Sequence, residues 1–208
     1  MKALILAAWQ WTRLKPLTNT KPKPLIDIFW KTILEHSLDV IYKHVDEIII
    51  VVKYKKELFR EYFWDRYKWT KITYFEQWDK KWTGWALDWL KISNTDLLVM
   101  NWDSIFDESD LEKIIKMSWY WCLVKVVENP SIYWIFEEKS PWLAKSIIEK
   151  PVDYVWNLAN LWVYKFNSEI INICEKLIPS IRWEYEITDA INEFISKNEF
   201  KLLPIDFE

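Results

Sequence analysis

Apolar and polar positions follow two different periods along this chain. Continuous apolar runs of five to seven residues, such as Lys2–Ala8 and Glu47–Val52, are typical of strands that are buried on both faces. In residues 31–42, by contrast, apolar side chains recur three and four positions apart, which marks one face of a helix. Polar breaks separate the two kinds of segment, so the pattern predicts strands and helices in alternation.

Strand and helix patterns alternate over the whole chain. The expected strands are 2–8, 47–52, 71–76, 96–101, 122–128, 132–137, 144–150, 161–166 and 200–205. The expected helices are 31–42, 55–63, 82–91, 108–117, 168–177 and 187–196. This order predicts an α/β fold with a mixed, mainly parallel central sheet between two helix layers, a three-layer Rossmann-like arrangement that binds ligands at the carboxyl ends of its strands. We expect one domain over residues 1–208.

The composition is unusual in two residue types, because the chain holds one glycine and 17 tryptophans. At the average usage of about 7%, a chain of 208 residues should hold about 15 glycines. Several tryptophans stand in polar breaks where a turn calls for glycine; examples are Trp64, Trp69, Trp78, Trp102 and Trp119. A protein that uses its indoles to stack on sugars, bases or a membrane interface should gather them on one surface, and the sequence shows no such pattern.

These counts lead to a hypothesis about the gene. UGA codons, which some bacterial lineages read as glycine, would have been translated as tryptophan. Only four of the 28 basic residues are arginine, which suits the AT-rich genomes where such reassignments arise. A non-glycine residue in a glycine conformation costs about 1–3 kcal/mol, and a dozen such sites would rival the whole stability of a domain. We therefore expect the chain with tryptophan at these positions to be inactive.

Charge and special residues exclude several classes of protein. A net charge of −3 argues against a nucleic-acid partner. No apolar run approaches the roughly 20 residues of a membrane helix and no signal-peptide pattern is present, so we expect a cytoplasmic protein without a membrane partner. Cys122 and Cys174 lack metal or redox spacing and are predicted to be reduced, buried thiols. For His36 and His44 we expect neither a metal nor a catalytic role.

Four charged residues indicate phosphate chemistry. Asp103 follows the apolar run "LLVMNW", where a carboxylate can reach a ligand or Mg²⁺, and Asp189 lies in "EYEITDAI". Arg13 and Lys23 flank a proline-containing loop after the first strand. Each residue alone is equally consistent with a cap, a turn or a solvated loop. Together, two carboxylates, two cations and a glycine-type loop favour Mg²⁺-dependent handling of phosphates.

With glycine at positions 9 and 11, the opening becomes "LILAAGQGTRLKPLTNTKPKPL", which closely resembles the signature of the sugar-1-phosphate nucleotidyltransferases. Further segments resemble landmarks of that family in the same order. These are "EQWDKKWTGWAL" for base binding, "LLVMNWDSIF" for the first metal aspartate, "IYWIFEE" and "IIEKP" for the sugar pocket, "NLWVYKF", and "RWEYEITDAI" for the second metal aspartate. The resemblance covers nearly the whole chain.

The resemblance implies a reaction and a set of site residues. A sugar 1-phosphate attacks the α-phosphorus of a nucleoside triphosphate in line and releases pyrophosphate, with Mg²⁺ as cofactor. Arg13 would neutralise the leaving pyrophosphate and Lys23 the α-phosphate, while Asp103 and Asp189 would hold the metal. The nucleotide-binding residues would be Leu6, Ala7, Ala8, Trp9, Gln10, Trp11, Thr12, Gln77, Trp82 and Thr83. The sugar-phosphate side would be formed by Trp134, Glu149, Lys150 and Asn160.

Several alternatives stay open at this point. The amide of Gln77 can pair with the imide edge of uracil or thymine, which favours UTP or dTTP. The restored "GTGGAL" and "VMNGDSIF" also resemble guanylyltransferases for mannose- or heptose-type phosphates. A non-catalytic regulatory module and a genuinely tryptophan-rich sugar- or membrane-binding protein are further readings. The end at "KLLPIDFE" fits a compact member or a C-terminally truncated one, without a fused acetyltransferase, and an oligomer is compatible with the sequence.

Overall fold

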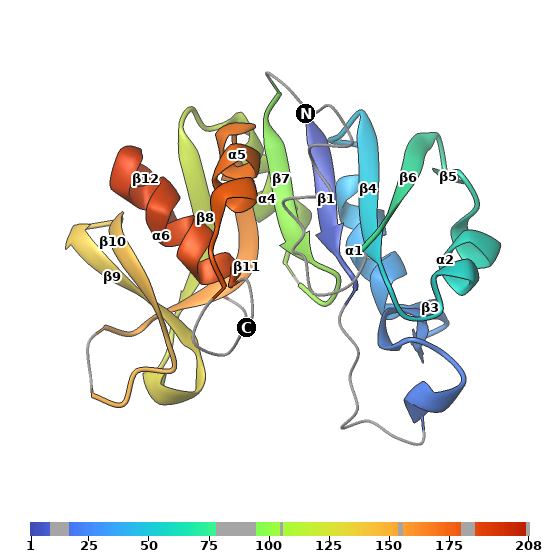
Figure 1. Ribbon diagram of the computed structural model, residues 1–208, viewed down its shortest axis with the longest axis horizontal. Helices are drawn as coiled ribbons and strands as arrows, with labels where there is room; N and C mark the ends of the chain where they lie inside the picture. Colours follow the sequence, from blue (N-terminus) through green and yellow to red (C-terminus); the bar gives the residue numbers. More distant parts are fainter. Residues whose placement is uncertain (9–16, 78–94, 105, 154–155, 180–185, 207–208) are drawn as a thin grey trace.

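The chain folds around one large mixed sheet, seen in Figure 1. This computed structural model describes residues 1–8, 17–77, 95–104, 106–153, 156–179 and 186–206. The ten strands lie in the order β5-β6-β4-β1-β7-β11-β8-β12-β10-β9. Their bounds are β1 Lys2–Leu6, β4 Glu47–Val52, β5 Arg66–Tyr67, β6 Thr70–Glu76, β7 Leu97–Asn101, β8 Tyr120–Val126, β9 Trp134–Ser140, β10 Leu143–Glu149, β11 Leu158–Phe166 and β12 Phe200–Pro204. A separate hairpin joins β2 (Asp27–Ile28) to β3 (Lys31–Thr32).

Strand direction divides the sheet into two halves. Strands β6, β4, β1 and β7 run parallel, with β1 between β4 and β7, so that Leu4 lies opposite Ile49 and Val99. Beyond β7 the ladders are mostly antiparallel, because β11 runs against both β7 and β8, and β9 and β10 form a hairpin. The expected mixed sheet is confirmed, and the parallel order belongs chiefly to the N-terminal half.

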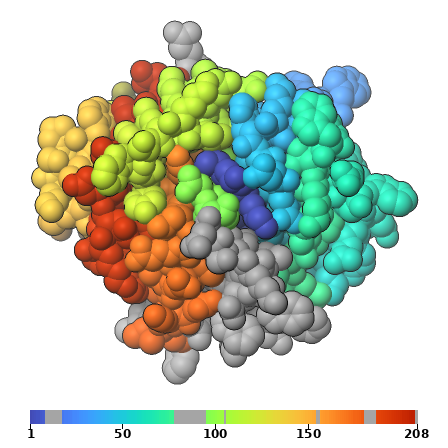
Figure 2. Space-filling view, turned by 90° about the horizontal axis from the view of Figure 1, so that it is seen from above, coloured from blue at the N-terminus to red at the C-terminus, as the bar shows by residue number. Residues whose placement is uncertain are grey.

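Helices cover both faces of the sheet, as the apolar runs predicted. The helices are α1 Ile33–Ile41, α2 Lys56–Phe63, α4 Glu108–Lys116, α5 Glu169–Lys176 and α6 Ile187–Lys197. One core cluster joins α1, α2 and α4 to the face that carries Ala3 and Ile5, and the other joins α5 and α6 to the face that carries Leu4. Figure 2, viewed from the edge where β1 begins, shows β1 in blue and β7 in green next to each other at the centre of the molecule. The helix expected at 82–91 lies outside the described residues.

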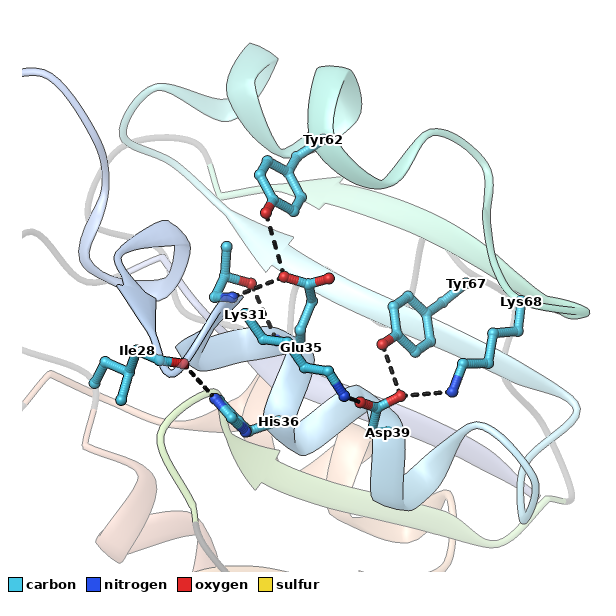
Figure 3. Close-up of polar contacts among 9 residues, drawn as sticks. Ile28, Lys31, Glu35, His36, Asp39, Tyr62, Tyr67 and Lys68 are labelled. Carbon is cyan, nitrogen blue, oxygen red and sulfur yellow. Dashed lines mark hydrogen bonds and ion pairs between the residues drawn. The ribbon is translucent and has the colours of Figure 1, made fainter.

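The start of α1 shows why these residues form a helix. The hydroxyl of Thr32 accepts a hydrogen bond from the Glu35 backbone N–H at 3.1 Å, and the Glu35 carboxylate accepts one from the Thr32 N–H at 2.7 Å. This capping box satisfies two backbone donors that the first helical turn leaves without partners. Figure 3 shows Glu35 facing Tyr62 of α2. One turn further along the helix, Asp39 faces Tyr67 and Lys68 at the β5–β6 turn. The box therefore fixes the register of the face that packs on the sheet.

The structure also bears on the expectations for the cysteines, for membrane helices and for His36. Cys122 and Cys174 are free and buried, and burial raises the pKa of both thiols. None of the described helices is long and apolar enough to cross a bilayer. His36 lies 2.8 Å from the Ile28 carbonyl oxygen, which ties α1 to the β2–β3 hairpin.

Candidate active site

The turn after β7 carries the first predicted metal ligand. The chain passes from Asn101 through Trp102 and Asp103 to Ser104, whose N–H donates to the Asn101 carbonyl at 3.3 Å. The buried hydroxyl of Ser37, on α1, lies 3.1 Å and 3.3 Å from the carbonyl oxygens of residues 102 and 104. On the other side, the Ser104 hydroxyl lies 3.4 Å from two carbonyl oxygens of β11. Because α1 and β11 both hold this turn, the position of Asp103 is fixed by the scaffold.

Lys23 and Asp103, both named as site residues from the sequence, lie close together. The Lys23 ammonium is 3.8 Å from the Asp103 carboxylate and 4.8 Å from the centre of the Trp102 ring. Lys23 opens a short 3-10 turn whose other residues, Pro24 and Leu25, are buried, so its backbone is anchored in the core. Burial raises the pKa of Asp103, and the charge of Lys23 opposes that rise. The Asp103 side chain is 38% exposed, so its carboxylate is partly desolvated by its surroundings and still open to a ligand.

A cavity of about 430 Å³ lies beside this pair. Its walls come from the ends of β1 and β7, the start of β9 and the middle of β11. The predicted site residues that line it are Leu6, Asp103, Trp134 and Asn160. Lys125 and Tyr133 line it as well and were not named as site residues: Lys125 is a lone lysine on a strand and carries no motif, whereas Tyr133 lies within the segment "IYWIFEE". The cavity thus brings together residues from both halves of the sheet.

Glu149 and Lys150 lie next to one wall of the cavity. Glu149, the last residue of β10, pairs with Trp134 across the β9–β10 ladder. The Lys150 ammonium lies 5.0 Å from the centre of the Trp134 ring. The backbone N–H of Lys150 donates to the Tyr133 carbonyl at 2.9 Å. Backbone pairing with Tyr133 and Trp134 therefore holds both residues beside the cavity.

Asn160 holds an irregular part of β11. Its side-chain N–H₂ donates to the Tyr164 hydroxyl at 2.6 Å, and its side-chain oxygen accepts from the Trp162 N–H at 2.9 Å. The ladder to β8 shifts register between Asn160 and Tyr164, so these bonds fill a bulge. Asn160 is 4% exposed and lines the cavity. The same side chain therefore stabilises the bulge and forms part of the cavity wall.

Some of the remaining predicted site residues have a defined position in the structure, and others lie outside the described residues. Asp189 is exposed in the first turn of α6 and is not among the described residues that line the cavity. Gln77 follows β6, and its N–H donates to the Val52 carbonyl at the end of β4. Ala7 and Ala8 are buried after β1. The predicted residues Trp9, Gln10, Trp11, Thr12, Arg13, Trp82 and Thr83 lie outside the described residues.

A second group of potential metal ligands lies away from the cavity. His44, Glu108 and Glu112 bring their ligand atoms within 4.8 Å of one another between α1 and α4. Lys43 pairs with Glu108, and Lys116 pairs with Glu112. We interpret this group as an ion-pair network between the end of α1 and α4.

The arrangement defines an α/β protein that offers an acid–lysine pair and a cavity at the carboxyl ends of its central strands, where such folds bind ligands. A Nucleotidyl transferase family model matches residues 2–205, and the chain belongs to this family.

Relatives of the chain are consistent with that membership. It is 38% identical over 202 residues to the "Bifunctional protein GlmU" of Methanocaldococcus jannaschii, a match that covers 97% of this chain and 48% of the relative. It is 32% identical over 206 residues to the "UTP–glucose-1-phosphate uridylyltransferase AglF" of Haloferax volcanii, covering 94% of this chain and 84% of that relative. The chain therefore spans about half of the length of the GlmU relatives.

Solved structures share the fold at low sequence identity. A UDP-glucose pyrophosphorylase complexed with UDP-glucose superposes with a TM-score of 0.83 at 22% identity, over 98% of this chain and 89% of that one. A glucose-1-phosphate thymidylyltransferase from Bacillus anthracis gives a TM-score of 0.84 at 20% identity, over 99% and 87%. These likenesses confirm the expected Rossmann-like nucleotidyltransferase fold.

Proposed function

We propose that this chain transfers a nucleotidyl group from a nucleoside triphosphate to a sugar 1-phosphate, with release of pyrophosphate. The observation that carries the proposal is the Lys23–Asp103 pair at 3.8 Å beside a cavity of about 430 Å³. UTP and glucose 1-phosphate are the favoured substrates, since the AglF relative is named for that pair. The expected cytoplasmic location and the absence of nucleic-acid and membrane partners stay predictions.

The chemistry asks for positioning and charge stabilisation more than for bond-making groups on the protein. Lys23 would neutralise charge that develops at the α-phosphate. Lys150 and Glu149, beside Trp134, would hold the phosphate and hydroxyl groups of the sugar. The backbone of residues 8–13 and Arg13 would hold the triphosphate, as the family resemblance implies.

The described acidic residues fit a Mg²⁺ ion in their donor chemistry. Carboxylate oxygens are the protein ligands that Mg²⁺ prefers, and Asp103 presents one from a turn that α1 and β11 fix. Asp189, exposed at the start of α6, would supply the second carboxylate. When bound, Mg²⁺ supplies positive charge that stabilises the reacting phosphate oxygens. Asp103 and Asp189 would be the residues that hold this ion.

Gln77 supports uracil or thymine as the base. It follows β6 and is bound through its N–H to the end of β4, so it stands at the carboxyl edge of the parallel strands. Its side-chain amide offers one donor and one acceptor, as the imide edge requires. Preference for GTP over UTP and dTTP would instead favour the guanylyltransferase alternative.

The proposal is tested by pyrophosphate release from a panel of UTP, dTTP and GTP with glucose, N-acetylglucosamine and mannose 1-phosphates. The assay uses two versions of the chain, one with tryptophan and one with glycine at the 17 positions, and we expect turnover only from the glycine version. Asp103→Asn should lower kcat at least about 100-fold, in the range seen when one charge-stabilising group is lost.

The matched control is Asp107→Asn. Asp107 is an exposed aspartate just before α4 whose side chain makes no capping bond, so its loss should leave turnover unchanged. Full activity in Asp103→Asn, or a folded glycine version that is inactive on the whole panel, would overturn the proposal. The second result would favour a non-catalytic module.

A further inference from the structure

We propose that residues 30, 64, 119, 142 and 162 are glycine in the protein that the cell makes. The structure describes ten of the 17 tryptophans, and five of them, at these positions, have a positive φ. Across the described residues, nine non-glycine residues have a positive φ, so tryptophan accounts for more than half of them. Only a few per cent of non-glycine residues adopt positive φ, and a bulky side chain there is an outlier.

The β2–β3 hairpin requires glycine by its turn type. Two residues connect the strands, Phe29 with φ 49° and Trp30 with φ 69°. Positive φ at both central positions is the pattern of a type I′ turn, whose second residue is most often glycine. No packing of the Trp30 side chain offsets the backbone strain, because the residue is 99% exposed.

The β9–β10 hairpin requires glycine for a different reason. Its two-residue connection is Pro141-Trp142, and Trp142 has a φ of 62°. Proline followed by a residue of positive φ is the pattern of a type II turn, which takes glycine at the second position. The sequence therefore reads as a Pro-Gly turn with an indole added.

Helix α2 ends in a conformation that only glycine reaches without a clash. Trp64, at its C-terminal end, has φ 56° and ψ −139°, and its N–H closes the last turn on the Arg60 carbonyl. This backbone region is the mirror image of the β region. Trp64 is 76% exposed, so no packing of the indole offsets the strain.

Among the described residues, the exposed indoles of Trp30 and Trp64 lie apart from that of Trp142. The β2–β3 hairpin and α2 lie at one end of the sheet in Figure 1, and the β9–β10 hairpin lies at the other. Trp119, with φ 79°, precedes β8 and is 57% exposed. Tryptophans scattered over separate turns fit a backbone requirement and do not fit a stacking platform.

Position 162 connects this inference to the cavity, and this step rests on the proposed function. Trp162 has a φ of 59° in the bulge of β11 and packs edge-to-face on Trp134 at 5.1 Å. Both rings, together with Trp102, line the cavity. Glycine at all three positions would remove three indoles from the walls and leave that space for substrate.

The stability test compares glycine with alanine. Each of Trp30, Trp64, Trp119 and Trp142 is changed to Gly and, separately, to Ala, and thermal unfolding is followed by circular dichroism. Relief of backbone strain should raise Tm by about 2–4 °C or more per glycine site. Alanine removes the indole but keeps the Cβ atom, so it should recover little of that rise. Tyr120→Gly is the control, because Tyr120 lies within β8 without a positive φ, its hydroxyl accepts from the Asn167 side-chain amide and its ring packs on Phe194, and this change should lower Tm.

The gene itself gives the direct readout. We expect UGA codons at the five positions, and peptides from the source cells with the mass of glycine there. UGG codons, or alanine variants that are as stable as the glycine variants, would overturn the inference. Neither measurement uses activity. A chain with glycine that is more stable, carries UGA codons and still lacks turnover would contradict the proposed function and leave this inference standing.

Discussion

Lys23 is a cation of the candidate site that is held by side-chain contacts and by an anchored backbone. Its ammonium stands between the Asp103 carboxylate and the Trp102 ring, on a turn that buried prolyl and leucyl side chains anchor. Sequence alone indicated Asp103 because it follows a buried strand at its carboxyl end, and Lys23 because, with Arg13, it flanks a proline-containing loop after the first strand. It did not indicate the hydrogen bonds of Asn160, since these depend on a bulge in β11 that no local pattern announces.

Replacing Lys23 with glutamine should lower kcat by about 100-fold or more, because a positive charge aimed at the reacting phosphate would be lost. The measurement is kcat and KM for pyrophosphate release in the glycine version. Lys21→Gln is the matched control, since Lys21 lies two residues away on the same segment and pairs with Asp27 at 2.8 Å. A Lys23→Gln enzyme with normal kcat would show that Lys23 does not act on the substrate.

Among the elements, α1 links the core to the site. Its capping box sets the register that directs Ser37 to the turn after β7, so the helix positions Asp103 without touching substrate. The 3.6-residue period predicted this helix at 31–42, and the structure has Ile33–Ile41. Periodicity does not encode strand direction, so it did not indicate which strands of the mixed sheet run antiparallel.

Ser37→Ala should loosen the Trp102–Ser104 turn. Loss of one buried hydroxyl that serves two carbonyl groups should cost about 1 kcal/mol, or about 2–4 °C in Tm. A positioning role adds a second effect, a fall in kcat with KM nearly unchanged at temperatures well below Tm. Ser196→Ala, which removes an exposed hydroxyl bonded within α6, should change neither constant. Equal kcat in Ser37→Ala and the parent would reduce Ser37 to a packing residue.

Across the whole molecule, ion pairs join elements that are distant in sequence. Asp39 of α1 accepts hydrogen bonds from Lys31, Tyr67 and Lys68, which Figure 3 shows converging on its carboxylate. Burial alone would raise the pKa of Asp39, but these bonds outweigh it and lower the pKa from 3.8 to about 2. Glu47 of β4 behaves in the same way: burial is outweighed by hydrogen bonds from Lys2 and Lys71, and its pKa falls from 4.5 to about 2.

These two carboxylates should make folding stability depend on pH. A carboxyl group whose pKa is lower in the folded protein stabilises it above the unfolded pKa, and that contribution is lost as pH falls through the folded value. Urea unfolding from pH 6 to pH 2 should therefore show a decline that begins near pH 4.5 and continues to about pH 2. The double variant Asp39→Asn, Glu47→Gln should be less stable at pH 6 and should show a flatter decline. An unchanged slope would contradict the assigned pKa values.

The proposed function is a claim about the whole molecule, that the chain transfers a nucleotidyl group to a sugar 1-phosphate beside the cavity at the carboxyl ends of β1 and β7. The direct measurement is product analysis of the glycine version with UTP labelled at the α-phosphate, Mg²⁺ and glucose 1-phosphate. The account predicts a labelled nucleoside diphosphate sugar and pyrophosphate in equal amounts, and formation of both at least about 100-fold slower with Asp103→Asn. Labelled nucleoside monophosphate, or no labelled product with any sugar phosphate and triphosphate of the panel, would contradict it.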